Sequence, residues 1–155
     1  MKPHYIAYTD GGARGNPGPA GSGAYITDAD GRPLKKAHKA LGHATNNFAE
    51  YTAVVLALET LKKMIPEAKR KATPIEIRMD SELVCRQMNG IYQIKEETLF
   101  PLFIKIHNMR VADFPHVTFV HIPREKNKDA DALSNIAMDE SERSIGERQA
   151  HLGVG

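Results

Sequence analysis

Residues 4–41, HYIAYTDGGARGNPGPAGSGAYITDADGRPLKKAHKAL, predict three strands that lie close together in the sequence. The first is expected to end at the turn signal Asp10-Gly11-Gly12, and Asp30-Gly31 is typical of a hairpin turn. Short connections between neighbouring strands favour an antiparallel meander. The three expected strands are His4–Thr9, about Gly21–Thr27 and about Pro33–Leu41.

The hydrophobic period changes after this meander. From Asn47 to Lys63 apolar residues recur at helical spacing, and Pro66 with the basic run that follows it is expected to break the helix. The further elements expected are strands over Ile75–Met79 and Val117–Ile122 and helices over Ser81–Met88, Leu99–Arg110 and Asn127–Met138. This order predicts an α/β fold with a mixed five-stranded sheet, the antiparallel three-strand meander plus two parallel strands, flanked by helices. We expect one domain over residues 1–139 and a loosely attached polar tail over residues 140–155.

The composition is that of an ordinary globular chain. Of 155 residues, 41% are hydrophobic and 26% are charged, and no stretch approaches the roughly 20 apolar residues that span a bilayer. The single Cys85 excludes an internal disulfide, and the N-terminus lacks the apolar core of a signal peptide, so we expect a cytoplasmic protein. A net charge of +2 is too small to indicate or to exclude nucleic-acid binding.

Four acidic residues are the strongest candidates for chemistry. Asp10 and Asp80 are expected at the carboxyl ends of strands, where ligands of such sheets tend to bind. Glu50 and Asp131 are expected in the first turns of two helices that could approach the same edge. Clustered carboxylates repel one another unless cations neutralise them, and Mg²⁺ prefers oxygen ligands.

Each acid also has a purely structural explanation. Asp10 could favour the Asp-Gly turn, and Glu50 could complete a capping box with Asn47. Asp80 could cap the helix that follows it, and Asp131 could respond to the helix dipole. If the four acids have no common function, all four of these structural explanations must be correct.

The same residues carry a family resemblance. YTDGGARGNPGPAGSG (8–23) resembles the opening motif of type 1 ribonucleases H, and ATNNFAEYTAV (44–54) resembles their second motif. MDSELVCRQMNG (79–90) and HIPREKNKDADALSN (121–135) resemble the third and fourth. The match covers about residues 4–138, and the four motifs occur in the family's order.

The resemblance implies an enzyme that hydrolyses the RNA strand of RNA/DNA hybrids and leaves 5′-phosphate and 3′-hydroxyl ends. Asp10, Glu50, Asp80 and Asp131 match the four catalytic acids, which hold two Mg²⁺ ions, with Mn²⁺ as a substitute. Asp129 is the rival of Asp131 for the last place. The resemblance also implies a monomer with no membrane association and no obligate protein partner.

The resemblance further implies a set of substrate contacts, for which turn formation and helix capping are the alternative roles of the asparagines. Relatives commonly carry Gln where this chain has Glu82, and a carboxylate is less suited to a phosphate. The implied contacts are made by Gly11, Asn16, Thr45, Asn46, Asn47 and Glu82.

The sequence departs from many relatives in two places. Residues 86–113 hold only scattered basic residues where relatives carry a basic insertion that grips the hybrid. The loop before the last acid reads IPRE and lacks the histidine of many relatives, so we assign Arg124 an auxiliary catalytic role and expect His121 to end a strand. The scattered basic residues are Arg86, Lys95, Lys105 and Arg110.

Two other functions fit part of the pattern. A related nuclease or integrase of the same fold would act on DNA, and a hybrid-binding module would have lost catalysis. The motifs NNFAEY and DADALSN argue against the first, and four intact acids argue against the second. No separate hybrid-binding domain is expected, since only nine residues precede Asp10.

Overall fold

A mixed sheet of five strands forms the centre of the computed structural model, which describes residues 2–152. The strand order is β3-β2-β1-β4-β5. The pairs β1–β2 and β2–β3 are antiparallel, and β1–β4 and β4–β5 are parallel, which confirms the predicted fold class. The strands are β1 (Tyr5–Ala13), β2 (Gly18–Asp28), β3 (Pro33–Ala44), β4 (Ile75–Met79) and β5 (Val117–His121).

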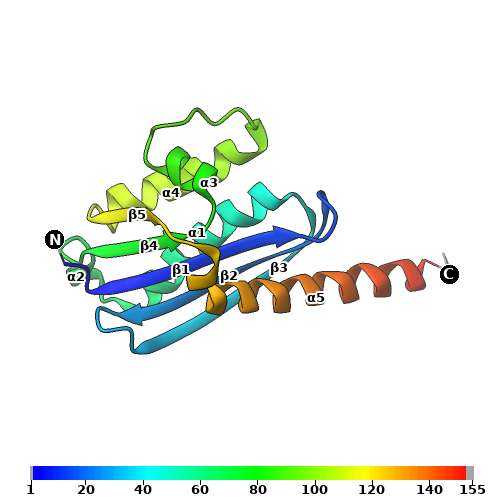
Figure 1. Cartoon of the computed structure of the whole chain (residues 1–155), viewed down its shortest axis with the longest axis horizontal. Coiled ribbons are helices and arrows are strands. Elements are labelled where there is room, and N and C mark those ends of the chain that lie inside the picture. The colour runs from blue at the N-terminus through cyan, green and yellow to red at the C-terminus, as the bar shows by residue number, and fades with distance from the viewer. Residues whose placement is uncertain (1, 153–155) are drawn as a thin grey trace.

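Helices cover both faces of this sheet. In Figure 1 the helix α1 lies behind β1, β2 and β3, and α5 crosses in front of them. The helix α4 packs against α1, and α3 packs against β5. The helices are α1 (Asn46–Met64), α2 (Glu67–Arg70), α3 (Glu82–Met88), α4 (Phe100–Ala112) and α5 (Lys128–His151), with short 3₁₀ turns η1 (Glu97–Leu99) and η2 (Arg124–Lys126).

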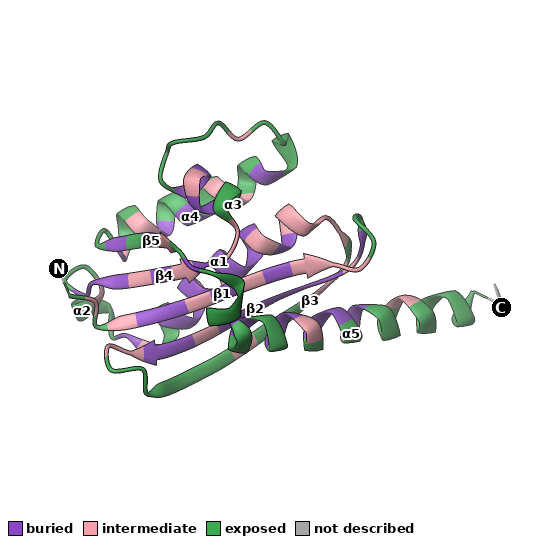
Figure 2. Cartoon of the chain, viewed as in Figure 1, coloured by how far each residue is buried: buried purple, intermediate pink, exposed green. Residues whose placement is uncertain are grey.

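The main hydrophobic core lies between the sheet and α1. Successive residues of a strand point to opposite faces, so Ala7 and Ile77 face this core while Tyr8 and Arg78 face the other side. Leu58 and Leu61 of α1 are completely buried against it, and Cys85 is a buried free thiol. Figure 2 shows the buried residues on the inner side of α1 and on the sheet-facing side of α5.

The prediction that β1 ends at a turn over Asp10-Gly11-Gly12 was wrong. These residues continue β1 and pair with Gly23, Ser22 and Gly21 of β2, and the reversal lies at residues 14–17. The glycines instead allow close packing. A Cβ at Gly11 would overlap the backbone of Ala49 in α1, and one at Gly21 or Gly23 would overlap α5. Glycine is required at these positions because a helix packs closely against the strand, and not because the chain forms a turn.

The other strand and helix ends also differ from expectation. The strands β2 and β3 are longer than predicted, since β2 begins at Gly18 and β3 continues to Ala44. A short helix, α2, occupies part of the expected break after Pro66. None of the helices within residues 2–152 is long and apolar enough to cross a membrane.

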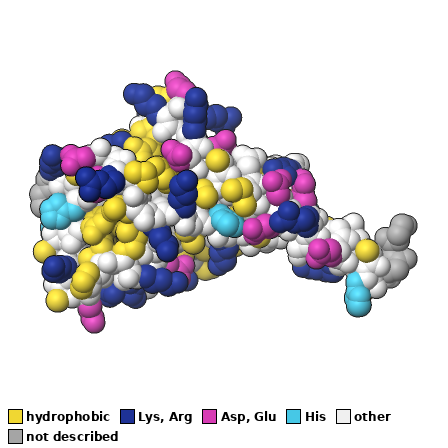
Figure 3. Space-filling model, turned by 90° about the horizontal axis from the view of Figure 1, so that it is seen from below, with side chains coloured by type: hydrophobic (Ala, Val, Ile, Leu, Met, Phe, Trp, Pro, Cys, Tyr) yellow, Lys and Arg dark blue, Asp and Glu magenta, His cyan; other side chains and the backbone are white. Residues whose placement is uncertain are grey.

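The helix predicted to end at Met138 continues to His151. Acidic and basic residues at i,i+4 spacing, such as Asp139 with Arg143, favour helix after Met138, and His151 suits the negative end of the helix dipole. In Figure 3 the last turns of α5 extend from the body and carry both acidic and basic side chains. The division into a catalytic domain and a tail at residue 140 remains a prediction, and its last residues, 153–155, lie outside the described chain.

Candidate active site

The two aspartates of the sheet lie on neighbouring parallel strands. Thr9 of β1 pairs with Met79 of β4, so Asp10 and Asp80 follow directly from paired positions. Asp80 does not cap α3, because Ser81 does so by accepting a hydrogen bond of 3.2 Å from the Val84 N–H. The capping explanation of Asp80 is therefore excluded.

The other two acids lie on helices. Asp131 lies in the first turn of α5, as predicted. Glu50 lies just after the first turn of α1 rather than in it, because the helix begins at Asn46, one residue earlier than expected. The N-cap is Thr45, whose hydroxyl accepts from the Phe48 N–H at 3.2 Å, so a capping box of Asn47 and Glu50 does not form.

Burial and mutual repulsion show that the four acids share one region. Burial raises the pKa of Asp10 to about 7, with smaller contributions from the charges of Asp80, Asp131 and Glu50 and opposition from the Ser134 hydrogen bond. Burial also raises the pKa of Glu50 to about 7. Near neutral pH both carboxyl groups are therefore only partly ionised, and a bound cation would favour their ionised form.

A divalent cation fits this donor set. Oε2 of Glu50 is buried without a hydrogen-bond partner among the described residues, as expected for an atom that faces a missing ligand. Within residues 2–152, however, no three acidic, histidine or cysteine side chains converge closely enough to enclose an ion. Mg²⁺ does not require an all-protein cage, because it usually keeps several waters and is bound through one or two carboxylates and substrate phosphates. A small pocket at this edge is lined by Thr9, Asp10, Glu50, Met79, Asp80, Ser81 and Val84.

Two polar residues that the sequence analysis missed hold the acids in place. Asn127 is almost fully buried before α5, and its amide donates to Asp80 Oδ2 at 3.0 Å and to the Thr9 carbonyl at 2.9 Å. Ser134, fully buried in α5, lies 2.8 Å from Asp10 Oδ2. Ser134 follows Asp131 by three residues, so it lies on the same side of the helix; that spacing was the available signal.

The asparagines predicted to contact substrate connect the β1–β2 turn to the start of α1. Asn16 Oδ1 accepts from the Asn46 N–H at 3.0 Å, and Asn46 Oδ1 accepts from the Ala13 N–H at 2.7 Å. Asn47 donates to Glu96 at 2.7 Å. These bonds fix their positions, while their contacts with substrate remain predictions.

Gly11 and Glu82 have other partners in this structure. Gly11 faces α1, as described above, and Glu82 forms an exposed ion pair of 2.9 Å with Arg86. The Glu82 carboxylate, which is less suited to a phosphate than the Gln of relatives, is thus already paired with a cation. Substrate contact by these two residues also remains a prediction.

Arg124 and His121 both lie beside the acids. Arg124 begins the η2 turn between β5 and α5, and its charge lowers the pKa of Glu50, against the larger effect of burial. His121 ends β5, as predicted, with Nε2 at 3.2 Å from the Asp80 carbonyl. The structure therefore places both within reach of the site without assigning either a catalytic role.

Comparison with known proteins identifies the family. The reverse transcriptase-like family model matches residues 8–137. The solved structure of LC11-RNase H1 in complex with an RNA/DNA hybrid is 49% identical, with a TM-score of 0.84 over 88% of this chain and 98% of that one. The chain belongs to the ribonuclease H1 family. Membership of this family implies dependence on a divalent metal ion.

Curated relatives of this ribonuclease H1 are longer proteins. The bifunctional protein Rv2228c of Mycobacterium tuberculosis is 38% identical over 90% of this chain, which spans 36% of that protein. Ribonuclease HI of Halobacterium salinarum is 36% identical over 87% of this chain, which spans 64% of that protein. The chain thus spans about a third of the first relative's length and about two thirds of the second's.

Proposed function

We propose that the chain is an endonuclease that hydrolyses the RNA strand of RNA/DNA hybrids with two Mg²⁺ ions, Mn²⁺ serving as a substitute. The observation that carries the proposal is the meeting of Asp10, Glu50, Asp80 and Asp131 at one edge of the sheet. Asp10 and Glu50 are partly buried and have a raised pKa, and one buried oxygen of Glu50 has no partner among the described residues. A site that only bound nucleic acid would gain nothing from this concentration of negative charge.

The four acids would hold the cations, and the surrounding residues would orient the acids. Bound cations would supply a hydroxide nucleophile at neutral pH and neutralise the charge on the leaving 3′ oxygen. Asn127 fixes Asp80, and Ser134 fixes Asp10, before substrate arrives. Arg124 can contact a phosphate through its guanidinium but cannot act as a base near neutral pH.

The substrate class is inferred from the site's surroundings and from the relatives. The structural relative LC11-RNase H1 was solved with an RNA/DNA hybrid, and the chain matches it over most of its length. Asn16, Asn46 and Asn47 lie at the β1–β2 turn and at the start of α1, and their amide groups suit a nucleic-acid backbone. Recognition of 2′-hydroxyls would distinguish the RNA strand, so we expect little sequence preference.

A cleavage assay tests the proposal. Labelled RNA/DNA hybrid, duplex RNA and duplex DNA of one sequence are incubated with the wild-type protein and Mg²⁺, Mn²⁺ or EDTA. We expect cleavage of the hybrid's RNA strand only, with either metal, and products that carry 5′-phosphates. Cleavage of the DNA duplex at a similar rate would support a DNA nuclease, and hybrid binding without cleavage would support a binding module.

A further inference from the structure

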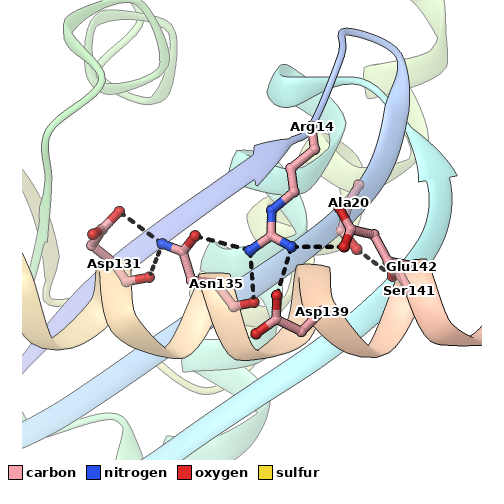
Figure 4. Close-up of polar contacts among 7 residues, drawn as sticks. All are labelled: Arg14, Ala20, Asp131, Asn135, Asp139, Ser141 and Glu142. Atoms are coloured by element: carbon pink, nitrogen blue, oxygen red, sulfur yellow. Dashed lines mark hydrogen bonds and ion pairs between the residues drawn. The ribbon is translucent and has the colours of Figure 1, made fainter.

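Arg14 joins the end of β1 to the middle of α5. It follows directly after β1, and its guanidinium lies over the helix (Figure 4). One terminal nitrogen contacts Asp139 at 2.6 Å and Glu142 at 3.1 Å. The other donates to Asn135 Oδ1 at 3.2 Å and to the Asn135 carbonyl at 3.4 Å. Both terminal nitrogens of the Arg14 guanidinium are therefore used: one contacts two carboxylates, and the other contacts Asn135.

The amide of Asn135 continues the contact to a proposed metal ligand. Its Nδ2 donates to the Asp131 carbonyl at 2.9 Å and lies 3.4 Å from Asp131 Oδ1. Figure 4 shows Asn135 between Arg14 and Asp131, one helical turn after the aspartate. Between Arg14 and the Asp131 carboxylate there is thus a single side chain, that of Asn135.

The chemistry of the two groups fixes the orientation of that side chain. A guanidinium has only donors, so it selects the rotamer that turns Asn135 Oδ1 towards Arg14. Nδ2 must then face Asp131, and its N–H restrains the carboxylate. We propose that Arg14 is a positioning residue for the metal site, acting on Asp131 through the Asn135 amide. The inference rests on the proposed function in taking Asp131 as a metal ligand.

Both ion pairs of Arg14 are made with residues of α5 that lie beyond Met138. A single exposed ion pair contributes little to stability, and the Arg14 side chain is 35% exposed. Asp139 and Glu142 instead restrict where the guanidinium can lie. Glu142, which lies beyond the predicted catalytic domain, therefore takes part in holding Arg14 in place.

Metal binding without nucleic acid tests the inference directly. Electron paramagnetic resonance of free Mn²⁺ gives the dissociation constant of the full-length protein and its variants. Loss of residues that orient a metal ligand typically weakens binding about 10- to 100-fold, and Arg14 acts one step further away. We expect Arg14→Ala and Asn135→Ala each to weaken Mn²⁺ binding about five-fold.

A double variant separates action through Asn135 from general loosening of the helix. If Arg14 acts through the amide, Arg14→Ala should have no further effect in the Asn135→Ala background. Arg14→Lys keeps the charge but lacks the fork, so we expect it to weaken Mn²⁺ binding as much as Arg14→Ala does. The inference would be overturned if the losses of Mn²⁺ affinity in Arg14→Ala and Asn135→Ala added in the double variant. It would also be overturned if Arg14→Ala or Arg14→Lys bound Mn²⁺ as tightly as wild type.

Ser141→Ala is the matched structural control. Ser141 is buried in the same helix and bonds to the backbone of β2 and β3, without touching the four acids. We expect it to lower the melting temperature and leave the Mn²⁺ dissociation constant unchanged; a weakening equal to that of Arg14→Ala would also overturn the inference. Mn²⁺ binding by a wild-type protein that cleaves no hybrid would refute the proposed function alone, whereas wild-type protein that binds no Mn²⁺ refutes the inference as well.

Discussion

Ser134 Oγ lies 2.8 Å from Asp10 Oδ2 across the interface of α5 and β1, and it lies 2.8 Å from the Asp131 carbonyl as well. The hydroxyl has a single proton and divides it between the two acceptors. Its bond to Asp10 favours the ionised carboxyl and opposes the effect of burial on the pKa. The serine therefore controls how readily Asp10 exchanges a proton for a metal ion.

Replacement of this serine should change the pH dependence of metal use. Ser134→Ala should raise the pKa of Asp10 further, because the remaining causes, burial and neighbouring charges, all raise it. Protons then compete better with Mg²⁺, so we expect about a three- to ten-fold higher half-saturating Mg²⁺ concentration at pH 7. The difference should shrink towards pH 9, where the carboxyl is ionised in both proteins. Identical Mg²⁺ titrations of variant and wild type at pH 7 would contradict the role given to this hydroxyl.

The metal-free protein should lose stability as the pH rises. The pKa of Asp10 is about 7 in the folded state and 3.8 ordinarily, so the folded protein retains a proton that the unfolded chain has released. Stability is then greatest below about pH 4 for this group and falls as the pH rises to about 7. Asp10→Asn removes this dependence, so its melting temperature without metal should match or exceed that of wild type at pH 8. Mg²⁺ should stabilise wild type more than the variant.

Calorimetry in EDTA across pH 4–9 measures this effect. Asp129→Asn serves as the control, because that acid is exposed and should change the slope little. A large loss of stability in Asp10→Asn without metal would show that the carboxylate has a structural role in β1. The same variant should lose nearly all cleavage.

Two acids of the first turn of α5 form a matched pair. Only Asp131 contributes to the raised pKa of Asp10, whereas the charge of Asp129 acts on Tyr25. Asp131→Asn should therefore slow hybrid cleavage about 100-fold, on the order of 2.7 kcal/mol, while Asp129→Asn stays within about two-fold of wild type. Steady-state cleavage rates of the two variants at saturating Mg²⁺ test this. A larger loss of rate in Asp129→Asn than in Asp131→Asn would show that Asp129 is the fourth metal ligand.

The two glycines that follow Asp10 should differ sharply on substitution. A Cβ at Gly11 overlaps the backbone of Ala49 and Glu50, whereas one at Gly12 makes ordinary contacts with side chains, at 3.5 Å from Met138 and 3.8 Å from Asn46 Oδ1. Gly11→Ala must push α1 away from the sheet, at about 1–3 kcal/mol in the free energy of unfolding, and it displaces Glu50 from the site. Gly12→Ala should change stability by less than about 1 kcal/mol. Denaturant unfolding of both variants measures this, and equal losses would show that contact with α1 does not explain Gly11.

The fold and the four acids could be predicted because both follow from local patterns. Alternation and helical spacing identify the elements, and the acids occur next to the ends of strands and helices. The extension of β1 through Asp10 could not be predicted, because Asp-Gly-Gly is a turn signal unless a helix packs against it. That helix begins at Asn46, distant in sequence.

The supporting residues were missed for a similar reason. Asn127 and Arg14 are unremarkable polar residues in the sequence, and their roles depend on partners 47 or more positions away. Glu142 was assigned to the tail because the apolar stripe of the helix ends at Met138, and Asp139 was placed at the very end of the predicted domain. Their partner Arg14 becomes apparent only when β1 and α5 lie together.

The last prediction separates Arg124 from His121. The positive charge of Arg124 acts on Glu50, and a guanidinium that contacts a phosphate cannot titrate near neutral pH. Arg124→Ala should slow turnover about ten-fold, on the order of 1.4 kcal/mol, without a new pKa in the pH–rate profile. His121→Ala should have a small effect on turnover, because within residues 2–152 the ring's hydrogen-bond partner is the Asp80 backbone carbonyl, next to the end of β4, and not a carboxylate. A catalytic histidine would instead impose a titration near pH 6.5 that disappears on its replacement. Profiles of both variants on a hybrid substrate distinguish these cases. Loss of a near-neutral titration in His121→Ala, with Arg124→Ala near wild type, would transfer the auxiliary role to the histidine.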